Sequence, residues 1–267
     1  SLRSPTHLIK TNTSLSIIQT NVTQQKKLNF SQWPSIKKNY LNLIKKATGN
    51  IIVMPESIIP QDIKRSNFFN EIQTISTSNN KFILFGSFIK KNNKVYNGSY
   101  LIRPNGVPIE YKKQRLMPFG ETLPFRKLLS KLIPKNLLFN DFDIGTEFID
   151  VKIKNLHLRP LICLEGIYNE FYRSKTNSMV TVLANNAWFN RSSASNKLLK
   201  FSQIYAAEYQ IPVIISANFG KSAFIDCKGK STHIANHHKS EILTASIESN
   251  SKKSIYHQFP WLGIIFV

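Results

Sequence analysis

The sequence predicts an α/β fold in which helices cover each sheet on one face. Apolar runs of strand length alternate with helical patterns along most of the chain. A chain of 267 residues, 42% of them hydrophobic, is long enough to bury a sizeable core. It contains no internal repeat, low-complexity segment or linker. We therefore expect one domain.

In the first half of the chain, hydrophobic periodicity and turn residues mark the expected helices and strands. Apolar residues between Ile36 and Ala47 recur at i, i+4, i+7, i+8 and i+11, which places them on one face of a helix. Residues 96–111 predict two strands joined by a turn at Pro104–Asn105–Gly106. Further strands are expected at 14–21, 50–57 and 81–89, and a second helix at 67–76.

The second half continues the alternation. Strands are expected at 156–163, 179–185, 211–218 and 241–249, with a strand and turn at 222–230. Helices are expected at 167–174 and 193–210.

Segment 123–139 has a different character. Its apolar residues recur at i, i+3, i+4, i+7 and i+8, with basic residues between them: Phe125, Leu128, Leu129, Leu132 and Ile133, interleaved with Arg126, Lys127 and Lys131. A basic amphipathic helix of this kind can lie on an anionic membrane surface. The alternative is a helix that packs its apolar face on the domain and keeps its lysines in water.

The formal net charge of +21 raises three interpretations: nucleic-acid binding, contact with anionic lipid, or a lysine-rich composition without a specific partner. The lysines are spread along the whole chain, and no zinc-finger spacing, KH loop or RRM signature is present. We expect no nucleic-acid partner. Neither a metal nor an organic cofactor is expected, because His237–His238 is a bare pair and no glycine loop could cradle a phosphate.

Scarce acidic residues stand at the ends of predicted strands. Glu56 follows one strand, and Cys163 and Glu165 follow another, while Lys113 and Glu121 lie eight residues apart. Taken singly, Glu56 could cap a helix, Lys113 could be a surface lysine, and Cys163 could be packing or half of a disulfide with Cys227. Together they suggest chemistry. A thiol needs a base or a nearby cation to become a nucleophile, and an ammonium can also stabilise an oxyanion.

Five segments carry a resemblance to a known family: MPES, YKKQRLMPFGE, ICLEGIY, NNAWF and AAEYQIPVIISANFGKSAFID. They resemble the nitrilase superfamily, and most closely its membrane-bound branch, the apolipoprotein N-acyltransferases. The resemblance runs from strand 14–21 to about residue 230. It implies a nitrilase-like α-β-β-α sandwich. It also implies a catalytic triad of Glu56 as general base, Lys113 as oxyanion-stabilising lysine and Cys163 as nucleophile.

The resemblance implies supporting roles as well. Glu121 would position the triad and acceptor, Glu165 would orient its neighbours, and the backbone N–H of Leu164 would serve the oxyanion hole. Leu123, Phe125, Leu128, Leu129 and Leu132 would face the membrane or substrate. The chain departs from the family pattern at four positions: Leu164 in place of Tyr, Leu28 or Phe30 where Trp is expected, Asn186 in place of Asp, and Tyr205 in place of Arg.

The implied reaction moves a fatty acyl chain from a phospholipid to the α-amine of a lipidated apolipoprotein through a cysteine thioester. The implied location is the outer, periplasmic face of the bacterial inner membrane. Because the chain starts with Ser1 and ends in the apolar run 259–267, we expect a catalytic domain over 1–258 and the start of a membrane helix at 259–267. A soluble amidase or nitrilase, or an inactive copy of the acyltransferase domain, are the alternatives.

Overall fold

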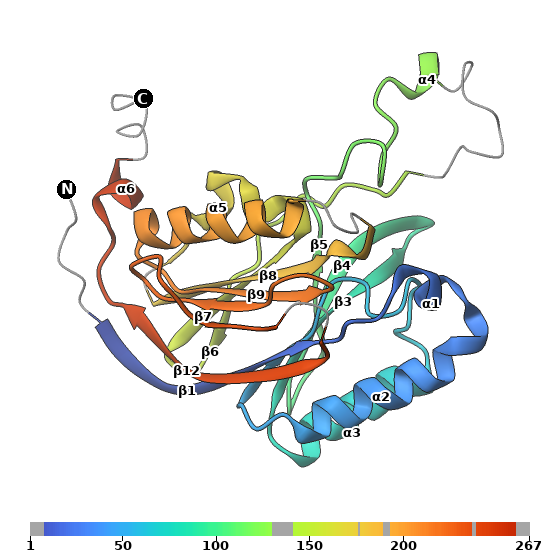
Figure 1. Cartoon of the computed structure of the whole chain (residues 1–267), viewed down its shortest axis with the longest axis horizontal. Helices are drawn as coiled ribbons and strands as arrows, with labels where there is room; N and C mark the ends of the chain where they lie inside the picture. Colours follow the sequence, from blue (N-terminus) through green and yellow to red (C-terminus); the bar gives the residue numbers. More distant parts are fainter. Residues whose placement is uncertain (1–7, 130–140, 176, 189–192, 237–238, 260–267) are drawn as a thin grey trace.

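Two six-stranded sheets pack face to face, and helices cover the outer face of each (Figure 1). The computed structural model describes residues 8–129, 141–175, 177–188, 193–236 and 239–259. The predicted α-β-β-α sandwich is confirmed.

The first sheet has the order β12-β1-β2-β3-β4-β5. Its strands are β1 (Leu8–Gln19), β2 (Ile51–Val53), β3 (Phe82–Lys91), β4 (Lys94–Ile102), β5 (Ile109–Lys112) and β12 (Glu241–Asn250). β1, β2 and β3 run parallel, whereas β12, β4 and β5 pair antiparallel with their neighbours. β12, the last long strand of the chain, therefore pairs with β1 and forms one edge of the first sheet.

The second sheet has the order β11-β10-β9-β8-β7-β6. Its strands are β6 (Val151–Ile153), β7 (Leu156–Ile162), β8 (Ser178–Asn185), β9 (Val213–Asn218), β10 (Ala223–Ile225) and β11 (Ser231–Ile234). β7, β8 and β9 run parallel at its centre. Parallel strands end at the same edge of a sheet, which brings the segments after β7 and β8 together.

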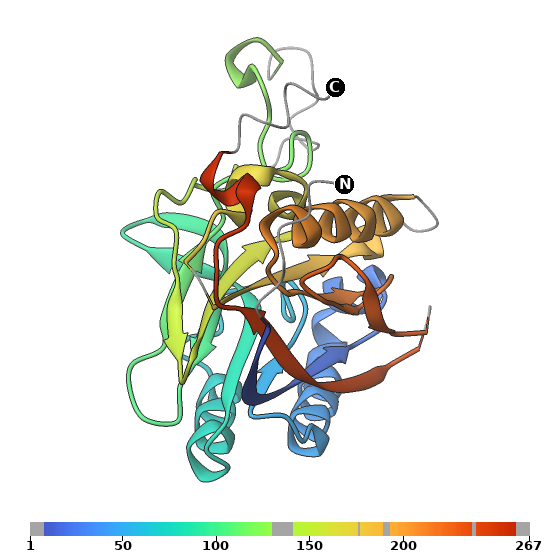
Figure 2. The same ribbon diagram turned by 90° about the vertical axis from the view of Figure 1, so that its left-hand side faces the viewer.

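The helices are α1 (Gln24–Leu28), α2 (Trp33–Lys46), α3 (Asn67–Ser78), α4 (Arg126–Leu129), α5 (Ala194–Tyr209) and α6 (Ile255–Gln258). α2 and α3 bury their apolar faces on the first sheet, and α5 covers the second (Figures 1 and 2). Ser66 caps α3 by accepting a hydrogen bond from the Phe69 N–H. Between the sheets lies a third apolar layer, to which Leu15, Val53, Leu158 and Met179 contribute.

Two differences from the sequence prediction concern short elements. The expected helix at 167–174 is instead a pair of 3₁₀ turns, η3 (Cys163–Ile167) and η4 (Asn169–Tyr172). The strands β6 and β11 and the short helices α1 and α6 are not among the predicted elements. β11 is a polar edge strand whose residues are largely exposed, so no apolar pattern marks it.

Candidate active site

Three predicted residues stand at strand ends of both sheets. Glu56 follows β2, Lys113 directly follows β5, and Cys163 directly follows β7. Charge interactions couple the three groups to one another. The two sheets therefore hold one cluster of a carboxylate, an ammonium and a thiol on rigid supports.

The ammonium of Lys113 lies between two carboxylates. Its Nζ is 2.9 Å from Oε1 and 2.8 Å from Oε2 of Glu121, and 3.8 Å from Oε1 of Glu56. Burial by itself would lower the pKa of Lys113, but Glu56, Cys163 and Glu121 outweigh it and raise the pKa above its ordinary value. Lys113 is therefore a lasting positive charge in a buried site.

The carboxylate of Glu56 is held at both oxygens. Nδ2 of Asn97 donates to Oε1 at 2.7 Å, and the backbone N–H of Asn185 donates to Oε2 at 2.8 Å. Burial raises the pKa of Glu56, Lys113 counteracts it, and Glu121 raises it further. Glu56 thus has a fixed orientation and a higher proton affinity than a free glutamate, which suits a general base.

Asn97 links the two acidic residues. Its Nδ2 donates also to Oε1 of Glu121, at 2.5 Å. Neither Asn97 nor Asn185 is among the site residues predicted from the sequence. Asn185 ends β8 and could have been found as a polar residue at a strand end, whereas Asn97 lies inside β4 and carries no such signal.

The backbone turns sharply at Cys163, where β7 gives way to η3. Its φ of 49° lies in the left-handed region, which is unusual for a residue with a side chain and costs about 1–3 kcal/mol. Such strain is concentrated at functional sites. Cys163 is half-buried and Cys227 is buried, and both are free, so the alternative of a disulfide between them is excluded.

The thiol of Cys163 is protonated at rest. Burial raises its pKa to about 12, and Glu56 acts in the same direction. Lys113 and the backbone N–H of Leu164 lower the pKa, but not enough to offset burial. A nucleophilic thiolate at neutral pH would therefore require transfer of the proton to a base.

Glu165 fastens the Cys163 turn to the segment that carries Lys113. Its Oε2 accepts the Ile162 N–H at 2.7 Å, while its Oε1 accepts the Tyr111 hydroxyl at 2.8 Å and the Gln114 N–H at 2.6 Å. The side chain is fully buried, and burial raises its pKa to about 7. Glu165 therefore joins strand ends of the two sheets.

The predicted membrane-facing residues do not behave alike. Leu123 is buried, and its N–H donates to Oδ1 of Asp141 at 2.8 Å. Phe125 is 82% exposed. The backbone of Leu128 and Leu129 belongs to α4. Leu132, with segment 130–140, lies outside the described residues.

The positions that depart from the family pattern occupy different surroundings. Leu28 and Phe30 are exposed, and the ring of Phe30 packs edge-on against Trp33 at 4.7 Å. Asn186 is buried at the start of the 3₁₀ turn η5 (Asn186–Trp188). The hydroxyl of Tyr205 donates to the Ile167 carbonyl at 3.0 Å, which ties α5 to η3.

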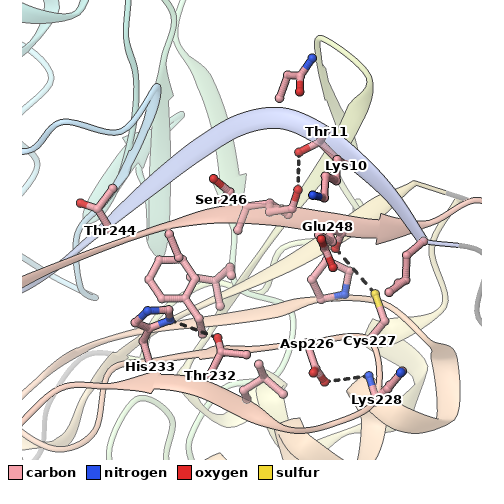
Figure 3. A pocket seen from close by; sticks show the side chains of 18 residues that line it. Lys10, Thr11, Asp226, Cys227, Lys228, Thr232, His233, Thr244, Ser246 and Glu248 are labelled. Atoms are coloured by element: carbon pink, nitrogen blue, oxygen red, sulfur yellow. Dashed lines mark hydrogen bonds between the residues drawn. The ribbon is translucent and has the colours of Figure 1, made fainter.

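A separate cavity of about 640 Å³ lies between β1 and β12 on one side and β10 and β11 on the other (Figure 3). Cys227 and His233 line it, but none of the candidate site residues does. In the described part of the chain, no three His, Cys, Asp or Glu residues are grouped to hold a metal ion. Nor does any helix there combine the length and apolarity needed to cross a membrane.

Solved structures of low sequence identity share this fold. A carbon-nitrogen hydrolase superfamily protein from Xanthomonas campestris superposes with a TM-score of 0.70 at 16% identity, over 94% of this chain and 96% of the other. An amidase from Nesterenkonia sp. superposes with a TM-score of 0.63 at 13% identity, over 99% of this chain and all of the other.

Relatives of higher identity are apolipoprotein N-acyltransferases. The enzyme from Vibrio parahaemolyticus is 30% identical over 92% of this chain and 52% of its own length. That from Helicobacter pylori is 32% identical over 78% of this chain and 50% of its own length. The chain thus spans about half the length of the curated relatives it matches. Because the sequence profile of the carbon-nitrogen hydrolases matches residues 15–255, the chain belongs to the carbon-nitrogen hydrolase family.

Proposed function

We propose that this chain transfers a fatty acyl group from a phospholipid to the N-terminal α-amine of a lipidated apolipoprotein, through a thioester on Cys163. The proposal rests on the candidate site, in which the Lys113 ammonium lies 3.8 Å from the Glu56 carboxylate and both groups act on the pKa of the free, half-buried Cys163. The similarity to apolipoprotein N-acyltransferases supports the choice of substrates.

In the first half-reaction, Glu56 takes the proton of the Cys163 thiol as sulfur attacks the ester carbonyl. The oxyanion that forms is stabilised by the Lys113 ammonium and the Leu164 N–H. The C–O bond then breaks, and Glu56 returns the proton to the departing oxygen. The products are a lysophospholipid and a thioester on Cys163.

In the second half-reaction, the α-amine of the acceptor attacks the thioester carbonyl. Glu56 takes a proton from the attacking amine, and the same two donors stabilise the oxyanion. Breaking the C–S bond releases the N-acylated protein, and the sulfur regains the proton from Glu56. Glu121 keeps Lys113 in place through both steps.

We propose that the segment around α4 contacts the membrane surface. In both views it stands out from the sandwich, and α6 lies on the same side (Figures 1 and 2). Phe119 and Phe125 are 66% and 82% exposed, and Arg126 and Lys127 follow them. Exposed aromatic rings beside basic residues suit an anionic headgroup layer. We place this surface on the periplasmic face of the inner membrane.

Intact-mass measurement after incubation with phospholipid vesicles tests the proposal. We expect an added acyl mass that hydroxylamine removes and that is absent from Cys163→Ala. Cys227→Ala should keep the adduct and serves as the matched control, since Cys227 is the other cysteine and is buried. Hydrolysis of small amides without an acyl adduct would instead assign a soluble-type amidase. Loss of both activities in a folded chain would assign an inactive copy.

A further inference from the structure

One lysine next to the candidate site is buried without belonging to the Glu56–Lys113–Cys163 cluster. Lys27 is 1% exposed, whereas its neighbour Lys26 on the same short helix α1 is exposed. The Nζ of Lys27 donates to the backbone carbonyl of Ser57 at 2.9 Å and to that of Glu56 at 3.4 Å. The side chain thus ends at the backbone of the proposed general base.

Burying an ammonium is costly unless it is paired or hydrogen-bonded. Among the described residues Lys27 makes no ion pair, and burial lowers its pKa to about 7 although the Glu56 charge acts in the opposite direction. Its donors are directed at carbonyls rather than at the Glu56 carboxylate. The carboxylate oxygens therefore stay available to Asn97, Asn185 and Lys113.

The backbone that Lys27 contacts is in a strained turn. Ser57 has a φ of 45°, in the left-handed region. Gly86 supports the turn from β3: its N–H donates to the Pro55 carbonyl and its carbonyl accepts the Ile58 N–H, each at 3.0 Å. A Cβ on Gly86 would lie 2.5 Å from the Cα of Glu56, so the turn is tightly packed against β3. Strained turns persist only where their surroundings over-determine them.

The helix that presents Lys27 is itself fastened to the site. The indole Nε1 of Trp33 donates to the Lys27 carbonyl at 2.7 Å. Nδ2 of Asn185 donates to Oε1 of Gln24 at 3.3 Å, and the N–H of the same Asn185 binds Glu56. α1 and the Glu56 turn are thus held by a common set of contacts.

We propose that Lys27 is a positioning residue: its hydrogen bonds to the Glu56 and Ser57 carbonyls fix the turn that aims the Glu56 carboxylate at Cys163. This inference rests on the proposed function, because it takes Glu56 to be the group that removes and returns the proton. Lys27 itself touches no reacting atom.

The test uses two soluble acyl donors that differ in the number of proton transfers that need Glu56. Both need Glu56 to deprotonate the Cys163 thiol, but only one needs it to protonate the leaving group. Dihexanoyl phosphatidylglycerol has an alkoxide leaving group that must be protonated, whereas p-nitrophenyl hexanoate has a leaving group that departs without a proton. Acylation of Cys163 is followed by intact mass for the unmodified chain, Lys27→Met, Lys26→Met and Glu56→Gln. Thermal unfolding of each variant reports its stability.

We expect Lys27→Met to slow acylation by the phospholipid about 10²-fold. A loss of this size is typical when a general acid–base group, here the Glu56 carboxylate, is displaced. Acylation by the p-nitrophenyl ester should fall less, because it needs Glu56 only to deprotonate the Cys163 thiol. Glu56→Gln should likewise lose more with the phospholipid than with the p-nitrophenyl ester, and Lys26→Met should match the unmodified chain.

Equal losses with both donors, or no loss, in Lys27→Met would overturn the positioning role while Glu56→Gln remains selective. If Glu56→Gln itself shows no selectivity, the assignment of Glu56 as the proton carrier fails instead. The two failures are therefore distinguishable.

Discussion

Lys113 and Glu121 form a buried ion pair in which one ammonium meets both oxygens of one carboxylate, at 2.9 and 2.8 Å. The pair fixes the ammonium only 3.8 Å from Glu56. The Met117 N–H donates to the same Glu121 at 2.7 Å, so the loop after β5 closes on its own lysine. A cation held in this way is ready to meet a developing oxyanion without reorganisation.

Replacing Lys113 with Met should remove the oxyanion donor and leave two carboxylates without their cation. We expect acylation of Cys163 to fall by about 10²–10³-fold and the free energy of unfolding to fall by about 3–5 kcal/mol. Single-turnover mass spectrometry and urea denaturation measure the two effects. Lys112→Met is the matched control, since the Lys112 ammonium lies over the Tyr96 ring at 4.4 Å and not in the site. Equal effects of both substitutions would contradict the assignment.

Removing the charge of Glu121 should make Cys163 easier to ionise. Burial and Glu56 raise the pKa of the thiol most, Lys113 lowers it, and Glu121 raises it. Glu121→Gln should therefore lower the thiol pKa, and Lys113→Met should raise it. Alkylation by iodoacetamide across pH, with Cys163→Ala as background, should shift to lower pH in the first variant and to higher pH in the second. Shifts in the same direction would refute this electrostatic account.

Glu165 should make the free energy of unfolding fall as the pH rises. Burial raises its folded-state pKa to about 7, above the 4.5 of an ordinary glutamate. Between these values the unfolded chain releases the proton and the folded chain keeps it. The stabilisation that Glu165 contributes is therefore complete below pH 4.5 and lost by about pH 7. The loss is at most about 3 kcal/mol. Urea denaturation should show the stability gap between the unmodified chain and Glu165→Gln narrowing over this range. A gap independent of pH would contradict the prediction.

Two exposed phenylalanines should contribute to membrane binding. Phe119 and Phe125 have little protein contact to lose, so the double substitution to Ser should leave the unfolding temperature nearly unchanged. Co-sedimentation with phosphatidylglycerol vesicles should weaken by about tenfold or more, because each ring loses apolar burial in the interface. Val107→Ser is the control, since Val107 is 74% exposed in the turn between β4 and β5. Equal binding by both variants would remove α4 from the proposed surface.

Much of the fold could be predicted from the sequence. The long apolar runs and helical periods located the central strands and the covering helices α2, α3 and α5, because these elements bury one face or both. Short elements were missed or mistaken: β11 is a polar edge strand, and the segment from 167 to 174, expected as a helix, contains the end of η3 and the 3₁₀ turn η4. Such pieces are defined by pairing and packing with distant residues.

The sequence by itself determined which strand ends carry Glu56, Lys113 and Cys163, since local pattern marks where a strand stops. Only the tertiary structure decided what surrounds them. Asn185 binds Glu56 across 129 residues of chain, and Asn97 joins Glu56 to Glu121 from the middle of a strand. Lys27 is one of 36 lysines and arginines, and nothing near it in the sequence marks it as buried. Burial and hydrogen bonding depend on which segments meet in space, so these partners emerge only when both sheets and α1 are packed together.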